Sequence, residues 1–101
     1  MAKIYISGPI TGVPDYKTHF AEAKVLIQNL HAEPVSPADT KEGLTYKEYI
    51  DTGLWQLMAC DMICMLPGWQ NSTGASLEYE YAKAVDMPIL HTYRTNGELH
   101  F

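Results

Sequence analysis

The chain has 101 residues, of which 47% are hydrophobic, and a formal net charge of −5 at pH 7. A chain of this size predicts one domain over residues 1–101 that buries about 60–70% of the surface of its unfolded state. Its seven basic residues form no cluster, which argues against nucleic acid polymers as partners. No apolar segment reaches the roughly 20 residues of a membrane span, which argues against a membrane protein.

The cysteines and histidines show no metal-binding pattern. Cys60 and Cys64 lack the paired spacing of a zinc site, and the four histidines share no spacing typical of ligands. The chain starts with a predicted strand rather than a signal peptide. We therefore expect a cytoplasmic protein with reduced thiols and without metal or cofactor. Because a core of this size gives little stability, we also expect a homo-oligomer.

The first half of the chain predicts two strands around one helix. Residues 3–7 are β-branched and aromatic, and residues 8–14 form a loop with two glycines and two prolines. Asp15 is a candidate N-cap of a helix that ends before Pro34, because proline disfavours helix in the residue ahead of it. Residues 33–36 predict a short second strand. The buried stripe of the helix is expected to be Phe20, Ala23, Leu26, Ile27 and Leu30.

The second half predicts two helices and two strands. Thr45 and Glu48 fit a capping box, which starts a helix that runs to about residue 59. Gly53 interrupts this helix at a cost of up to about 1 kcal/mol, so it either allows close packing or marks a side chain that this protein lacks. Residues 61–66 predict a buried strand, a third helix runs to about residue 86, and residues 88–93 form a fourth strand. Residues 95–101 are polar and are expected to be a tail. The stripe of the second helix is expected to be Ile50, Leu54, Leu57 and Met58.

The alternation of strands and helices predicts an α/β fold. Right-handed crossovers give a small doubly wound parallel sheet of the flavodoxin or Rossmann-like kind, with about four strands flanked by three helices. We expect the strand order 2-1-3-4. Ligands then bind beyond the carboxyl ends of the first and third strands, where the loops of residues 8–12 and 68–74 open onto one crevice.

The third helix carries an acid on its inward face. Glu78 begins a stripe with Tyr81, Ala82 and Val85 at helical spacing, and acids are seldom buried without a partner or a task. Ahead of it, residues 71–74 supply hydroxyls and backbone donors at a helix N-terminus, which suits an anion. Tyr46, Tyr49 and Asp51 at the start of the second helix are candidates to face the same crevice, which would then suit a nucleoside or nucleotide.

Each of these residues also has a purely structural interpretation. Glu78 can bond backbone amides at a helix start, and Ser72 and Thr73 can act as helix caps. Asp51 can be a solvated helix residue, and Asp61 can cap or pair at the start of its strand. These alternatives stay open on the residues alone.

Four motifs occur in an order typical of one superfamily. They are residues 4–12, Cys60-Asp61, Leu66-Pro67-Gly68-Trp69, and Ser72-x-Gly74-Ala75-x-x-Glu78-x-x-x-Ala82. Over residues 3 to about 90 the chain resembles the nucleoside 2-deoxyribosyltransferase superfamily, most of all its small branch found in phages and prophages.

The resemblance implies that Glu78 attacks the anomeric carbon and forms a glycosyl-enzyme intermediate. Base-exchanging relatives carry an aspartate where Ser72 stands, and it binds the sugar 5′-hydroxyl. Serine at this place is similar to the 2′-deoxynucleoside 5′-phosphate N-hydrolases, where it helps to bind the phosphate. A 5′-monophosphate is then favoured, because a carboxylate would repel it. The other substrate contacts that the resemblance implies are Tyr5, Gly8, Thr11, Gly12, Trp69 and Gly74.

One position departs from the resemblance. Relatives carry an aspartate eight residues before Asp61 that supports protonation of the leaving base, and this chain has Gly53 there. Either Asp51 takes over as the second catalytic residue or acid assistance is missing. The leading hypothesis is therefore cleavage or transfer of an N-glycosidic bond. The alternative is a catalytically weak or inactive module that senses or sequesters a nucleotide-derived ligand, and a third is an interaction protein with a vestigial crevice.

Overall fold

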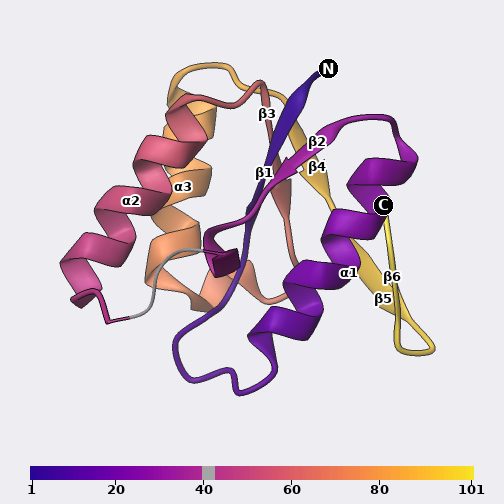
Figure 1. Cartoon of the computed structure of the whole chain (residues 1–101), viewed down its shortest axis with the longest axis horizontal. Coiled ribbons are helices and arrows are strands. Elements are labelled where there is room, and N and C mark those ends of the chain that lie inside the picture. The colour runs from indigo at the N-terminus through magenta and orange to yellow at the C-terminus, as the bar shows by residue number, and fades with distance from the viewer. Residues whose placement is uncertain (40–42) are drawn as a thin grey trace.

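A four-stranded parallel sheet forms the centre of the protein (Figure 1). The computed structural model describes residues 1–39 and 43–101. The strands lie in the order β2-β1-β3-β4, so the predicted α/β fold and strand order are confirmed. Their bounds are β1 Lys3–Ser7, β2 Glu33–Val35, β3 Met62–Met65 and β4 Ile89–His91.

Three helices cover the two faces of the sheet. Helix α1 (Tyr16–Asn29) lies on one face, whereas α2 (Tyr46–Met58) and α3 (Thr73–Ala84) lie on the other (Figure 1). Two short 3-10 helices, η1 (Pro37–Asp39) and η2 (Trp69–Asn71), precede α2 and α3. The capping box of α2 is present, since Thr45 Oγ1 accepts from the Glu48 N–H at 3.2 Å and Glu48 Oε1 accepts from the Thr45 N–H at 2.9 Å. Asp15 is the N-cap residue of α1, but its carboxylate bonds His19 instead of the backbone.

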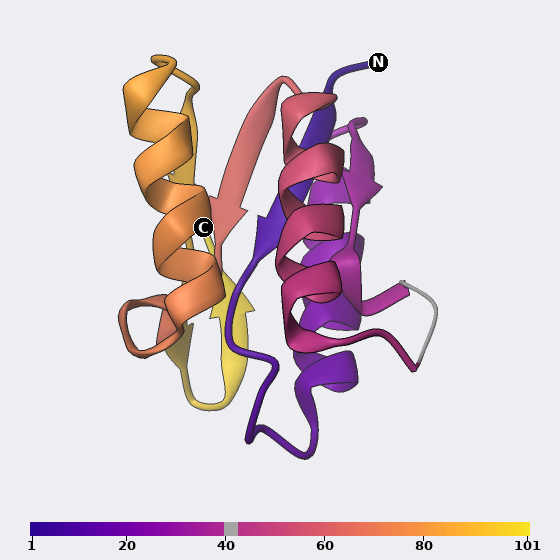
Figure 2. The ribbon, with the colours of Figure 1, turned by 90° about the vertical axis from the view of Figure 1, so that its left-hand side faces the viewer.

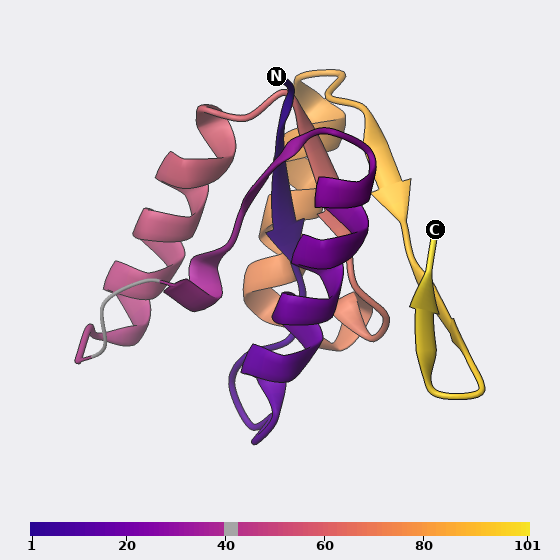
Figure 3. The same ribbon diagram turned by 45° about the vertical axis from the view of Figure 1, so that its right-hand side comes forward.

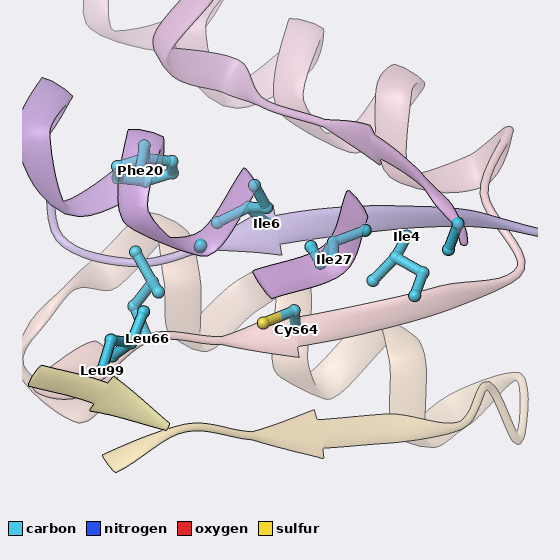
Figure 4. Packing of buried hydrophobic residues seen from close by; sticks show 9 residues of the cluster. Ile4, Ile6, Phe20, Ile27, Cys64, Leu66 and Leu99 are labelled. Atoms are coloured by element: carbon cyan, nitrogen blue, oxygen red, sulfur yellow. The ribbon is translucent and has the colours of Figure 1, made fainter. Parts of the chain in front are cut away.

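Alternation along β1 divides its side chains between the two faces. Ile4 and Ile6 belong to the core beneath α1, which Figure 4 shows. Tyr5 belongs to the second cluster, together with residues of α2 and α3. Because side chains two apart in a strand share a face, Ser7 points the same way as Tyr5. The strand therefore carries two hydroxyl side chains toward α2 and α3.

The end of the chain differs from the expected polar tail. Strands β5 (Tyr93–Thr95) and β6 (Glu98–His100) form an antiparallel hairpin, which follows β4 in Figure 3. The turn is Asn96-Gly97, both at positive φ, as hairpin turns require. Leu99 is 6% exposed within the core beneath α1, and Arg94 bonds Glu22 of that helix at 2.9 and 3.1 Å. One buried leucine and one ion pair thus anchor a segment whose other residues are mostly polar.

Three positions expected in helical stripes are exposed instead. Val85 lies just beyond α3 and is 50% exposed, because Asp86 takes a positive φ and the helix ends at Ala84. Leu30 caps the end of α1, and Met58 is the last residue of α2; both side chains are exposed. Each of these positions is the last residue of its helix or the first one beyond it, so helical spacing predicts burial there that the structure does not show.

Candidate functional site

A cavity of about 640 Å³ opens at the carboxyl ends of the strands, as predicted. The loop after β1 and the first turns of the helices gather at this end of the sheet (Figure 2). The expected contacts Tyr5, Gly8, Thr11, Ser72, Gly74 and Glu78 all line the cavity, as do Tyr46 and Tyr49. The remaining lining residues are Pro9, Ile10, Tyr16, Pro37, Ala38, Ile50, Asn71, Thr73 and Ala75.

Glu78 is held by two hydroxyl groups of β1. Its side chain lies in the second turn of α3, and the residue is 9% exposed. The Tyr5 hydroxyl donates a hydrogen bond to Oε2 at 2.6 Å, and Ser7 Oγ donates one to Oε1 at 2.6 Å. Each carboxylate oxygen therefore has one fixed partner and keeps acceptor capacity for another. The backbone-amide interpretation of Glu78 does not describe these contacts, because the partners of both carboxylate oxygens are side-chain hydroxyls.

Burial dominates the electrostatics of this pair. It raises the pKa of Glu78 above its ordinary value, although the hydrogen bonds from Ser7 and Tyr5 lower that pKa in part. Burial and the neighbouring charge of Glu78 raise the pKa of Tyr5 well above its ordinary value. Tyr5 thus remains protonated and acts as a donor to the carboxylate.

Gly53 brings the backbone of α2 against the same pair. A methyl group on Gly53 would lie 2.6 Å from Glu78 Oε2 and 2.9 Å from the Tyr5 hydroxyl oxygen. Carbon atoms of this kind do not occur that close to other heavy atoms, so any side chain here would displace its neighbours. These contacts support the close-packing explanation for this mid-helix glycine.

The first turn of α3 forms another part of the cavity wall. Ser72 is the N-cap of α3, and its Oγ accepts a hydrogen bond from the Ala75 N–H at 3.2 Å. A methyl group on Gly74 would lie 2.9 Å from Ile50 Cδ1, so glycine allows the starts of α2 and α3 to approach each other. The capping role expected of Ser72 is thus confirmed, and it leaves Ser72 on the cavity wall.

Three predicted site residues lie elsewhere. Asp51 is exposed on α2 and bonds Lys47 at 2.5 Å, so it stands outside the described lining of the cavity. Gly12 forms a turn at φ 78° beyond the lining, and Trp69 stacks on Tyr79 with ring centroids 4.3 Å apart. The solvated interpretation of Asp51 is therefore the one that its contacts support.

Sequence reasoning missed Ser7 and Tyr16. The sequence pattern predicts Ser7 only as the end of a strand, although its two-residue spacing from Tyr5 places both on one face of β1. Tyr16, the first residue of α1, lines the cavity because α1 starts at the ligand-binding edge of the sheet. Asp61 behaves as expected, since its carboxylate accepts a hydrogen bond from the Lys3 N–H at 2.8 Å.

Residues 1–39 and 43–101 contain neither a cluster of metal ligands nor a helix that could span a membrane. No group of three or more histidine, cysteine or acidic side chains in this part of the chain is arranged to hold a metal ion. None of the helices described is both long and apolar enough to cross a membrane.

Comparison with known proteins supports the fold. The sequence pattern of a domain of unknown function, DUF4406, matches residues 2–91. No curated protein matches the chain significantly in sequence.

Solved structures share the architecture at low identity. A 2-deoxyribosyltransferase from Bacillus psychrosaccharolyticus is 17% identical with a TM-score of 0.69, over 89% of this chain and 71% of that one. The enzyme of the same name from Leishmania mexicana is 19% identical with a TM-score of 0.71, over 100% and 79%. A conserved protein from Enterococcus faecalis V583 is 20% identical with a TM-score of 0.66, over 95% and 65%. At these identities the likeness shows a common fold.

Proposed function

The chain belongs to the DUF4406 family, and we propose that it cleaves or transfers the N-glycosidic bond of a (deoxy)nucleoside or its 5′-monophosphate, with Glu78 as the nucleophile. One observation carries this proposal. Glu78 is a buried carboxylate on the wall of a cavity of about 640 Å³, fixed by hydroxyls on both oxygens. Buried acids of this kind with a shifted pKa cluster at catalytic sites.

The chemistry suits a carboxylate held in this way. Breaking an N-glycosidic bond develops positive charge on the anomeric carbon, which an ionised Glu78 stabilises and then traps as a glycosyl ester. Water or an acceptor base resolves the ester. Tyr5 and Ser7 fix the orientation of the carboxylate, so less freedom is lost when it meets C1′.

The start of α3 is the proposed site for the 5′ end of the sugar. Ser72 and Thr73 line the cavity at the N-terminus of α3, where the helix dipole favours an oxygen-rich or anionic group. Because Ser72 Oγ already accepts from Ala75, its own O–H is the group that would meet a ligand oxygen. Asp51 has no role in the proposed reaction, because it pairs with Lys47 outside the described lining of the cavity.

The second candidate is a module that binds a nucleotide-derived ligand without turnover. Gly53 favours it, since α2 has no side chain at the place closest to Glu78 and Tyr5. Binding needs the cavity and its polar walls but does not need an acid for the leaving group.

Base release from a panel of nucleosides and 5′-monophosphates, followed by chromatography, separates the two candidates. The wild type should release free base, and Glu78→Gln should lower the rate by roughly 10³-fold or more. Glu80→Gln is the matched control, because Glu80 is exposed on the same helix. Tight calorimetric binding without base release would support the binding module, and undiminished release by Glu78→Gln would refute the nucleophile.

The expected homo-oligomer also stays a proposal. Trp55 is 73% exposed on α2, and Leu77 and Val85 are exposed on or next to α3, so the outer side of these helices carries large apolar groups. Light scattering should give at least twice the 11.4 kDa mass of one chain. A single-chain mass at high micromolar concentration would refute the proposal.

A further inference from the structure

The cavity walls combine aromatic rings with a carboxylate. Tyr5, Tyr16, Tyr46 and Tyr49 all line it. Among the lining residues that the structure describes, Glu78 is the only charged side chain, and no lysine, arginine or histidine is present. Aromatic faces and a carboxylate both attract positive charge, and the attraction grows where water is excluded. The electrostatics of these side chains therefore suit a cationic group in the ligand, whereas the N-terminus of α3 suits an oxygen-rich or anionic group.

Steric crowding restricts the supply of protons beside Glu78. Because a methyl group on Gly53 would lie 2.6 Å from Glu78 Oε2, α2 cannot place an acidic side chain next to this oxygen without displacing it. The hydroxyls of Tyr5 and Ser7 already donate to the carboxylate. Burial also raises the pKa of Tyr5 well above its ordinary value, so Tyr5 is a poor proton donor to a leaving base.

Whether a leaving base needs a proton depends on the charge that the base carries. A neutral purine or pyrimidine leaves as an anion unless an acid protonates it, which is why glycosidic cleavage ordinarily uses a general acid. A base whose ring already carries a permanent positive charge leaves as a neutral molecule. Its departure therefore needs no proton from the protein.

Resting on the proposed function, we propose that this site selects nucleosides whose base is cationic in the ring joined to the sugar, such as pyridinium nucleosides or N7-alkylated purine nucleosides. A Glu78 carboxylate oxygen bonds to C1′ while the C1′–N bond breaks and its electron pair returns to the base. The carboxylate charge and the cationic charge cancel, which leaves a neutral glycosyl ester and a neutral base. Water then hydrolyses the ester, restores the carboxylate and releases one proton to solvent.

The electrostatics of Glu78 favour the same class of substrate. Burial raises the pKa of Glu78 and so disfavours its ionised, nucleophilic form. A positive charge bound nearby opposes this effect, because an opposite charge favours the ionised carboxylate. A cationic nucleoside would thus help to ionise the group that attacks it, whereas a neutral nucleoside would not.

Guanosine and 7-methylguanosine test the selectivity, since they differ by one methyl group and one positive charge. Base release is measured for both as ribonucleosides and as 2′-deoxyribonucleosides, with nicotinamide riboside as an independent cation. Each rate is divided by its rate in buffer, because methylated purine nucleosides lose their base spontaneously. The expected result is an enhancement at least tenfold larger for the cationic member of each pair, lost in Glu78→Gln. Equal enhancements that depend on Glu78 would overturn the selectivity and leave the proposed function intact. No enhancement with any substrate would overturn both.

Two variants of Tyr49 test the aromatic wall. Tyr49→Phe keeps a ring and should keep the wild-type preference, whereas Tyr49→Leu should lower the ratio of cationic to neutral enhancement by about twofold to thirtyfold. Thermal unfolding and circular dichroism establish that both variants are folded. If folded Tyr49→Leu keeps the full preference for the cation, the contribution of the aromatic wall is refuted.

Discussion

Replacing Gly53 with alanine adds one methyl group at the point where α2 meets Glu78 and Tyr5. The new carbon would lie 2.6 Å from Glu78 Oε2, and ordinary contacts begin at 3.4 Å, so the carboxylate or the helix must move by about 0.8 Å. Overpacking of this kind costs about 1–3 kcal/mol, and the better helix propensity of alanine returns about 1 kcal/mol. The movement can also weaken the hydrogen bond from Tyr5 to Glu78. A hydrogen bond to a charged group contributes about 1.5–3 kcal/mol to stability, and part of this contribution is then lost. We therefore expect a net destabilisation of about 2 kcal/mol.

Urea unfolding followed by circular dichroism measures this change. Asp51→Ala is the matched control, since it lies on the same helix, is exposed and loses only a surface pair with Lys47. It should change the free energy of unfolding by about 0.5 kcal/mol or less. The close contact at Gly53 would be refuted if Gly53→Ala were about 1 kcal/mol more stable than the wild type, as expected for an unhindered helix position.

Three further predictions address the site and the hairpin. Tyr5→Phe removes a hydrogen-bond donor to the Glu78 carboxylate and so raises the pKa of Glu78. The acidic limb of the profile of rate against pH should therefore move to higher pH. An unmoved limb would refute the effect of Tyr5 on the pKa of Glu78. Because the pKa of Glu78 is raised on folding, its protonated form adds stability below its ordinary value of 4.5, and this is lost as the pH rises through the folded pKa. Urea unfolding should thus show wild type losing stability relative to Glu78→Gln as the pH rises above 4.5, and a relative gain would contradict the sign. Leu99→Ala should cost about 2–5 kcal/mol in the same assay, whereas a loss under about 0.5 kcal/mol would show that the hairpin is not anchored there.

The sheet was predictable because its signals are local and strong. The short apolar runs and the capping box at Thr45 indicate the strands and helices, and the right-handed crossover rule limits the topologies that they can form. The expected order β2-β1-β3-β4 is one of these topologies, and it is the observed one. The terminal hairpin was missed because only Leu99 among its residues is buried, although Asn96-Gly97 is a strong hairpin signal. The polar composition of these residues thus predicts a tail, whereas the Asn96-Gly97 turn motif predicts the hairpin that is observed.

The candidate site was predictable in part. Glu78 stood out because it occupies the inward face of a helix, and its burial confirms that placement. The spacing of Ser7 from Tyr5 places both side chains on one face of β1, but the hydrogen bond from Ser7 to Glu78 needed the structure. The role of Gly53 also needed the structure, since its spacing fits close packing and a lost side chain equally well. Both residues depend on distances between elements that are remote in sequence. Helical or strand periodicity does not predict such distances.

The nucleophilic role of Glu78 is tested most directly by trapping the covalent intermediate. The wild type is mixed with 7-methyl-2′-deoxyguanosine, and the reaction is quenched in acid during turnover. The protein is then analysed by intact-protein and peptide mass spectrometry. We expect a mass increase equal to one deoxyribosyl group on the peptide that contains Glu78, present in Glu80→Gln and absent in Glu78→Gln. Base release at the wild-type rate by Glu78→Gln, or a sugar adduct at another residue, would contradict it.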